Sequence, residues 1–295
     1  MEIKKVKPDK LFIASDGPRN KMEEEVVNSV REYVLNNIDW PCKVKTLFRR
    51  KNLGCKLAVS QAITWFFDHV EKGIILEDDC LPSQSFFKFC SKLLDRYKNN
   101  KNIMMISGSN LLGKVDIKES YFFSQHFAIW GWATWKRAWT LYDVNIRKWP
   151  KFKKKNGLKK IFRNYFTRKY YEINFDLRKE NFGDTWDYQW AFACLYNNGL
   201  SITPKLNLVS NIGSIGHHTN MSSKFNFKKI YEIQEHLVHP TKIFVNKKYD
   251  GLLYSLLVPN IAKLIIFDIM RKLLKSIGLF DIFWKLYTKS KQNIF

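Results

Sequence analysis

The chain has 295 residues, of which 45% are hydrophobic and 16% aromatic, so it can bury a large core without a structural metal or a disulfide framework. With 50 Lys and Arg against 27 Asp and Glu, its formal charge of +23 favours an anionic partner such as nucleic acid, an anionic lipid surface or a phosphorylated substrate. The five scattered cysteines lack the paired spacing of a zinc site and the density of a secreted scaffold, which predicts reduced, cytosolic thiols.

Residues 1–113 predict an alternation of strands and helices. Residues 1–10 are polar and charged, so we expect no secretory signal. Apolar runs predict strands at residues 10–18, 42–50, 73–76 and 102–109, and helical spacing predicts helices at residues 23–36, 52–70 and 85–98. Continuous apolar strands that alternate with helices indicate an α/β fold with a mostly parallel sheet covered on both faces.

Ligands of such open sheets bind beyond the carboxyl ends of the strands. In this sequence those ends carry Asp16, then Arg49 with Arg50, then the triplet Glu77, Asp78 and Asp79, then Ser107 with Gly108. Polar side chains are therefore expected to gather at one edge of the sheet.

The acidic triplet needs a cation beside it, because neighbouring carboxylates repel one another and are costly to hold away from water. Strand alternation points Glu77 and Asp79 to one side and Asp78 to the other, which suits a divalent ion held by one or two carboxylates, water and phosphate. Oxygen ligands favour Mn²⁺ or Mg²⁺. The alternative, which position alone supports equally, is a solvated turn whose acids precede a helix.

Three stretches carry a family resemblance: NLGCKLAVSQAI, GIILEDDCLP and MMISGSN. In this order they resemble bacterial glycosyltransferases of the nucleotide-diphospho-sugar type, related to family 2 and built on the Rossmann-like GT-A fold, over most of residues 10–220. In that family an Asp-x-Asp type of motif binds Mn²⁺ or Mg²⁺ together with the donor diphosphate. The resemblance implies that Asp79 is the direct metal ligand and that Glu77 and Asp78 support it or contact the ribose and donor sugar.

A second acidic segment, GDTWDYQW, resembles the part of the family that takes the proton from the acceptor hydroxyl. The resemblance implies that Asp187 is this base in an inverting transfer, with Trp186 and Trp190 able to stack on sugar rings and Asp184 in reserve. The alternative is that Asp184 caps a helix and Asp187 joins its first turn.

Four more residues are candidate ligand contacts. His218 matches a family position that completes the metal shell or touches the diphosphate, although a surface role is the alternative. Arg50 and Asn52 lie beside a predicted helix N-terminus, where a diphosphate would find positive charge, unless they belong to a solvated strand end. Asp16 either contacts the base or ribose or caps the turn in which it lies.

The aromatic stretch of residues 129–139 resembles the loop that covers the sugars in the family, the alternative being a packed core segment. Members of the family also carry a strand and a helix before the stretch that corresponds to residues 10–18, and the loop of that strand helps to hold the nucleoside base. We therefore expect that either the start site is taken too late in this sequence or the nucleotide pocket is incomplete.

The predicted organisation is a glycosyltransferase domain at residues 1–223, with a nucleotide half at about 10–113 and an acceptor half at about 114–223, followed by a basic amphipathic helical region at 224–295.

Between residues 147 and 179 there are thirteen Lys and Arg against two acids. Residues 261–290 have polar positions three and four apart, namely Asp268, Arg271, Lys272 and Lys275. This pattern is typical of a helix lying in an anionic membrane interface, or of a helix docked on the protein's own core. Because no apolar stretch reaches about 18 residues, we expect no transmembrane helix.

The cysteine pattern predicts a cytoplasmic protein, the basic amphipathic region adds the hypothesis of a peripheral position at the inner face of the cell membrane, and the resemblance implies a metal-dependent glycosyltransferase. It would move a sugar from a UDP-sugar or similar donor to a saccharide or lipid-linked acceptor in surface polysaccharide or lipopolysaccharide synthesis. The rival classes are a nucleic-acid-binding protein, which fits the sequence pI near 9.7, and a Mg²⁺-dependent nucleotidyltransferase. No helix-turn-helix, RNP or zinc-finger pattern is present, so we expect no nucleic-acid partner.

Overall fold

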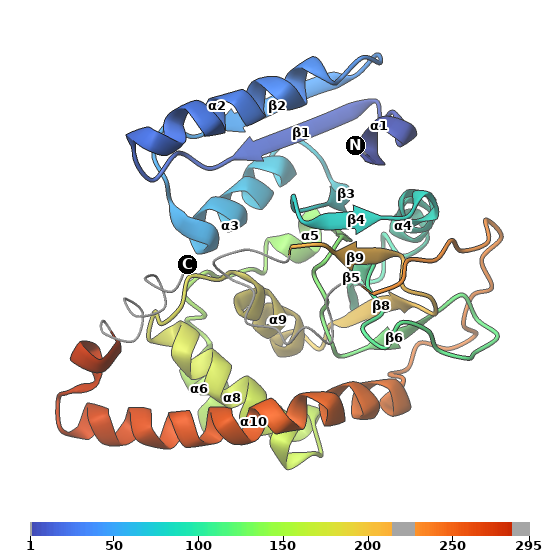
Figure 1. Cartoon of the computed structure of the whole chain (residues 1–295). Coiled ribbons are helices and arrows are strands. Elements are labelled where there is room, and N and C mark those ends of the chain that lie inside the picture. Colours follow the sequence, from blue (N-terminus) through green and yellow to red (C-terminus); the bar gives the residue numbers. More distant parts are fainter. Residues whose placement is uncertain (1, 214–227, 285–295) are drawn as a thin grey trace.

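The computed structural model describes residues 2–213 and 228–284 and shows a mixed α/β protein (Figure 1). The predicted alternation in the first 113 residues is confirmed, with a short helix α1 (Glu2–Val6) before it and a short strand β4 (Cys80–Pro82) inside it. The confirmed elements are β1 (Lys10–Ser15), α2 (Lys21–Asn36), β2 (Lys43–Phe48), α3 (Gly54–Phe67), β3 (Lys72–Ile75), α4 (Gln84–Arg96) and β5 (Ile103–Ser107).

The strands form one mixed sheet and two separate pairs. The five-stranded sheet has the order β3-β7-β5-β8-β6, completed by β6 (Tyr121–Ser124), β7 (Trp132–Trp135) and β8 (Leu200–Pro204). Among its described pairings β5 and β8 are parallel and the others antiparallel, so the expectation of a mostly parallel sheet is not confirmed. Strands β1 and β2 form a parallel pair of their own, and β4 pairs with β9 (Val209–Asn211).

Strand β7 is one of two reasons for the mixed sheet, the other being β6, which runs antiparallel to β8. The sequence analysis interpreted its stretch as a loop over the sugars, but β7 lies between β3 and β5 and runs antiparallel to both. All four of its residues are buried. The alternative interpretation, a packed core segment, is therefore correct for Trp132, Trp135 and the following Trp139.

The unit formed by β1, α2 and β2 lies at one end of the molecule, at the top of Figure 1. Helix α2 begins after Asn20, whose side chain accepts a hydrogen bond from the Glu23 amide at 3.1 Å. Val26 and Val30, expected on the apolar face of this helix, are 63% and 57% exposed. Helix α2 therefore forms where its periodicity predicts, but these two side chains remain on the surface.

The later helices cover the other side of the five-stranded sheet. They are α5 (Lys136–Trp139), α6 (Trp149–Lys154), α7 (Gly157–Ile161), α8 (Tyr165–Lys179), α9 (Asp187–Tyr196) and α10 (Lys247–Ser276). Helix α10 runs along the end of the molecule opposite α2 (Figure 1) and contacts α8 and β6. Within the described residues no single helix is long and apolar enough to span a membrane, and only residues 247–256 with 261–276, bent by 65°, pass that test as a pair, by length and composition alone.

Asp250, near the start of α10, connects this helix to β6 through hydrogen bonds. Its carboxylate accepts hydrogen bonds from the Ser124 hydroxyl at 2.5 Å and the Gln125 amide at 2.9 Å. Burial raises the pKa of Asp250 to about 6, partly offset by these two hydrogen bonds. Because this pKa exceeds the unfolded value, the folded state binds the proton more tightly. The resulting stabilisation is present below about pH 4 and is lost as the pH rises through about 6.

Asp250→Asn removes this titration and keeps a side chain of similar shape. We expect the free energy of unfolding of the variant, relative to the wild type, to rise by up to about 3 kcal/mol between pH 4 and pH 7.5. Urea unfolding of both proteins at the two pH values measures this change, and the comparison cancels the titration of all other groups. An equal difference at both pH values would contradict the assignment.

Candidate functional site

The acidic triplet lies at the carboxyl edge of the five-stranded sheet. Since β3 and β5 both run antiparallel to β7, they are parallel to each other, and Gly108 after β5 lies at the same edge as Glu77. The Gly108 amide donates to the Gly131 carbonyl at 2.7 Å, which ties the loop before β7 to this edge. Gly131 has φ +60°, and a β-carbon there would lie 2.8 Å from Val209 Cγ2, so no side chain fits.

Glu77 and Asp187 lie within range of electrostatic interaction at this site, although 109 residues separate them in the chain. The half-buried Glu77 has its pKa raised to about 8, first by burial and then by the negative charges of Asp79, Asp187 and Asp78. Asp187 is thus close enough to disfavour the ionised form of Glu77. The structure thereby brings the predicted metal-binding triplet and the predicted base into one acidic cluster.

Asp79 is held by the segment that follows β9. Its Oδ2 accepts a hydrogen bond from Asn211 Nδ2 at 2.8 Å, and its backbone carbonyl accepts one from the Ile212 amide at 2.8 Å. These contacts extend the pairing of β4 with β9. The same segment continues through Gly213 toward His218, which lies outside the described residues, so the predicted ligand role of His218 stays a prediction.

No cationic side chain of the described chain forms an ion pair with the triplet or with Asp187. Among the described residues no three His, Cys, Asp or Glu side chains are grouped closely enough to hold a metal by themselves. Carboxylate oxygens are the donor type that suits Mg²⁺ or Mn²⁺, and an ion at the triplet would take one or two carboxylates and the rest of its shell from water and phosphate.

Two carboxylates cap the N-terminus of α3. Asp184 accepts hydrogen bonds from the Cys55 amide at 2.7 Å and the Lys56 amide at 2.8 Å. Asp16 accepts from the Leu53 amide at 3.0 Å and the Gly54 amide at 3.1 Å. Asp184 thus caps α3 and not the helix that begins at Asp187, which the capping alternative had expected. Asp16 does support its own turn, since its Oδ1 also accepts a hydrogen bond from the Gly17 amide at 2.9 Å, and its contact with ribose or base stays a prediction.

Gly54 allows these carboxylates to approach the helix. Its φ is +75°, and a β-carbon there would lie 2.5 Å from Asp184 Oδ2. Because the free amides of α3 are already satisfied, this helix N-terminus does not offer a diphosphate the amides that the sequence analysis expected. Asn52 also supports the turn, since its Nδ2 donates to the Gly17 carbonyl at 3.0 Å. Arg50 is exposed, and its contact with a diphosphate stays a prediction.

Asp187 is the first residue of α9, as the capping alternative expected. Its Oδ1 accepts a hydrogen bond from the Thr185 hydroxyl, which orients the carboxylate. Trp186 and Trp190 are fully buried and pack against Trp132, with ring centroids 5.7 and 5.5 Å from it. The prediction that these two rings stack on sugars is wrong, because they close the hydrophobic core beneath the cluster.

Sequence reasoning missed two residues of the site. Asn211 is the side chain that holds Asp79, and its only local signal is an amide between a short apolar strand and a glycine turn. Cys55 lies beside the cluster, where burial and the charges of Glu77, Asp184, Asp187 and Asp16 raise the pKa of its thiol to about 12. The Cys55 thiol is therefore neutral and unreactive at physiological pH.

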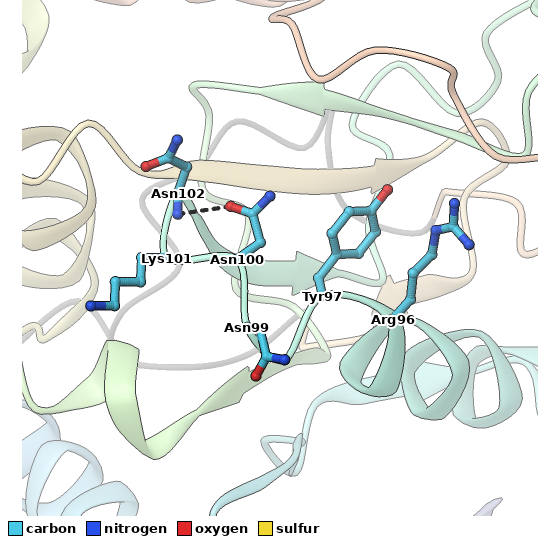
Figure 2. Close-up of a pocket in the computed structure, with 6 residues that line it drawn as sticks. All are labelled: Arg96, Tyr97, Asn99, Asn100, Lys101 and Asn102. Carbon is cyan, nitrogen blue, oxygen red and sulfur yellow. Dashed lines mark hydrogen bonds between the residues drawn. The ribbon is translucent and has the colours of Figure 1, made fainter.

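Two pockets lie away from the acidic cluster. Figure 2 shows an open pocket of about 630 Å³ lined by Arg96, Tyr97 and residues 99–102, which precede β5 and so lie at the amino edge of the sheet. A smaller pocket of about 260 Å³ lies between α4 and residues 233–237. Neither contains a residue of the cluster.

A scan against protein-family models found no match for this chain, and neither did a search of curated proteins.

Proposed function

We propose that the protein is a metal-dependent glycosyltransferase of the GT-A type that transfers a sugar, with inversion, from a nucleotide-diphosphate donor to a saccharide or lipid-linked acceptor of a bacterial surface polysaccharide. The observation that carries this proposal is the meeting of Glu77 and Asp187 in a cluster without a cationic side chain. Such an arrangement combines the two things that the transfer needs: a place for a metal diphosphate and a separate base.

In this proposal Asp79 and Glu77 hold the metal. When bound, the ion neutralises the diphosphate and stabilises the charge that develops on it as it leaves. The raised pKa of Glu77 agrees with this role, since the cluster lacks the positive charge that would keep this carboxylate ionised. Asn211 donates to Oδ2 of Asp79, and the Cys80 thiol lies 3.7 Å from Oδ1, so both contacts orient this carboxylate.

Asp187 carries the proton transfer. Its carboxylate takes the proton of the acceptor hydroxyl as the acceptor oxygen forms a bond to the anomeric carbon of the donor sugar. The bond from that carbon to the diphosphate oxygen breaks, and the electron pair leaves with the nucleoside diphosphate. The Thr185 hydroxyl holds Asp187 in position. The buried indoles of Trp186 and Trp190 give the start of α9 a rigid support.

Calorimetric titration of the full chain tests the proposal. We expect UDP-sugar or GDP-sugar to bind in the presence of Mn²⁺ and to lose at least about tenfold in affinity when EDTA replaces the metal, since the diphosphate is held mainly through the ion. A DNA duplex of matched phosphate concentration is the control for binding that depends on charge alone. Binding of DNA without any metal-dependent binding of nucleotide sugars would overturn the proposal in favour of a nucleic-acid-binding protein.

A further inference from the structure

One face of helix α10 is covered by the rest of the protein, and the opposite face, which is apolar, is exposed. Five large apolar residues in its second half are 48 to 65% exposed and recur three and four positions apart, so they share one stripe about 100° wide. We call this stripe the outer stripe; it consists of Ile266, Ile269, Met270, Leu273 and Ile277.

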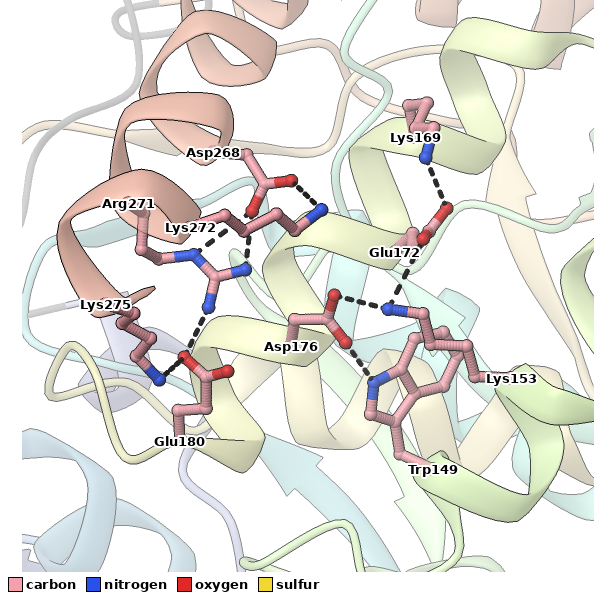
Figure 3. A network of polar contacts seen from close by, with 10 residues as sticks. All are labelled: Trp149, Lys153, Lys169, Glu172, Asp176, Glu180, Asp268, Arg271, Lys272 and Lys275. Atoms are coloured by element: carbon pink, nitrogen blue, oxygen red, sulfur yellow. Dashed lines mark hydrogen bonds and ion pairs between the residues drawn. The ribbon is translucent and has the colours of Figure 1, made fainter. Parts of the chain in front are cut away.

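The covered face is fixed by ion pairs, as Figure 3 shows. Arg271 is buried and binds both Asp268, on its own helix, and Glu180, which follows α8. Lys275 also reaches Glu180, at 2.7 Å, and Lys272 reaches Asp268, at 2.6 Å. The sequence left open whether this helix lies in a membrane interface or docks on the protein's own core. The burial of Asp268 and Arg271 and the ion pair of Arg271 with Glu180 show that this face docks on the protein.

Docking through the polar face directs the outer stripe away from the protein. A contiguous exposed apolar stripe on a folded chain marks a surface that binds a partner or a membrane. The aromatic contact of Phe162 with Tyr254, at 5.8 Å between ring centroids, places the segment before α8 beside the first half of α10.

This neighbouring segment is strongly basic. The two acids of residues 147–179 are already engaged, since Lys153 binds Glu172 at 3.3 Å and Asp176 at 2.6 Å. Lys159, Lys160 and Arg163 are exposed, and so are the aromatic side chains of Tyr165 and Phe166, at 52% and 42%. Exposed cations beside exposed aromatic side chains fit the headgroup region of an anionic bilayer, and this segment and the outer stripe belong to the same α8–α10 part of the fold.

We propose that the outer stripe of α10 binds the surface of an anionic lipid bilayer, with the cations of residues 159–163 contacting the lipid phosphates. A second copy of the chain is a poor occupant, because each copy carries a formal charge of +23 and the two basic segments would repel each other. This surface is independent of the proposed transfer reaction, and it would bring the enzyme to a lipid-linked acceptor if that reaction holds.

Vesicle flotation of the full chain tests this proposal. We expect binding to vesicles of 70% phosphatidylcholine and 30% phosphatidylglycerol at 0.1 M NaCl, and much weaker binding to pure phosphatidylcholine or at 0.5 M NaCl. The double variant Ile269→Ser/Leu273→Ser should bind the anionic vesicles at least about tenfold more weakly, because two large apolar side chains no longer enter the interface. Both positions are exposed, so the variant should fold as the wild type does.

The matched control is Val26→Ser/Val30→Ser, which removes two equally exposed apolar side chains from α2 at the other end of the molecule. This control should bind the anionic vesicles as the wild type does, and Lys159→Gln/Lys160→Gln should lose part of the salt-sensitive binding. An equal loss in the α2 control, or equal binding to neutral vesicles, would overturn the proposal. So would sedimentation velocity showing a wild-type dimer that the α10 variant converts to a monomer without vesicle binding.

Discussion

Replacing Asp187 with Asn is expected to lower the turnover of sugar transfer by at least about 10²-fold, because the amide cannot take the proton of the acceptor hydroxyl. The affinity for the nucleotide sugar should stay within about twofold of the wild type, since the proposed metal ligands are unchanged. Single-turnover transfer with a saturating donor, together with calorimetry for the donor, separates these two quantities.

Asp184→Asn is the matched control, because it removes one carboxylate from the same loop. Asp184 caps α3 through two backbone amides, so its variant should lower the free energy of unfolding by about 0.5–2 kcal/mol and leave turnover largely intact. If Asp187→Asn kept normal turnover and Asp184→Asn lost it, the two assignments would have to be exchanged. A loss in both variants at unchanged stability would point to a base shared by the pair.

Replacing Asp79 with Asn should abolish the metal-dependent part of nucleotide-sugar binding. The amide keeps one oxygen but loses the charge that holds a divalent ion, so we expect the donor affinity in Mn²⁺ to fall at least about tenfold, to the level found in EDTA. The calorimetric titration described above, repeated with the variant in both buffers, measures the change.

The control for Asp79 is Asp95→Asn, which removes the same charge from an exposed position on α4 where the carboxylate binds Lys72. This variant should bind the donor as the wild type does. Metal-dependent binding that survived in Asp79→Asn would remove Asp79 from the metal site and leave Glu77 as the principal candidate. Thermal unfolding of both variants shows whether the difference arises from the site or from folding.

The elements of the first 113 residues could be predicted from the sequence, because each depends on signals within a few neighbouring residues. Apolar runs, helical spacing and turn residues predict β1, α2, β2, α3, β3, α4 and β5 in their correct order. The same local signals place Glu77, Asp78 and Asp79 after a strand and Asp187 at the start of a helix. The chemical character of the candidate site is therefore visible before the fold is known.

Long-range packing decided what the local signals could not. Strand β7 looks like any aromatic, glycine-containing stretch until it pairs with both β3 and β5, and its antiparallel pairing, like that of β6 with β8, makes the sheet mixed. Helix α10 has a polar face in sequence, yet Arg271 on that face is buried in an ion pair with Glu180, and the apolar outer stripe is exposed.

The two acids of the GDTWD stretch illustrate the same division between local and tertiary information. By sequence alone Asp187 is the preferred base and Asp184 the reserve, only three positions apart. The structure separates them, because Asp184 binds the amide of Cys55, which is 129 residues away in the chain, whereas the charge of Asp187 helps to raise the pKa of Glu77. The sequence by itself determined which chemical groups this protein carries, and the tertiary structure decided which of them meet, since contacts between distant segments form only when the whole core packs.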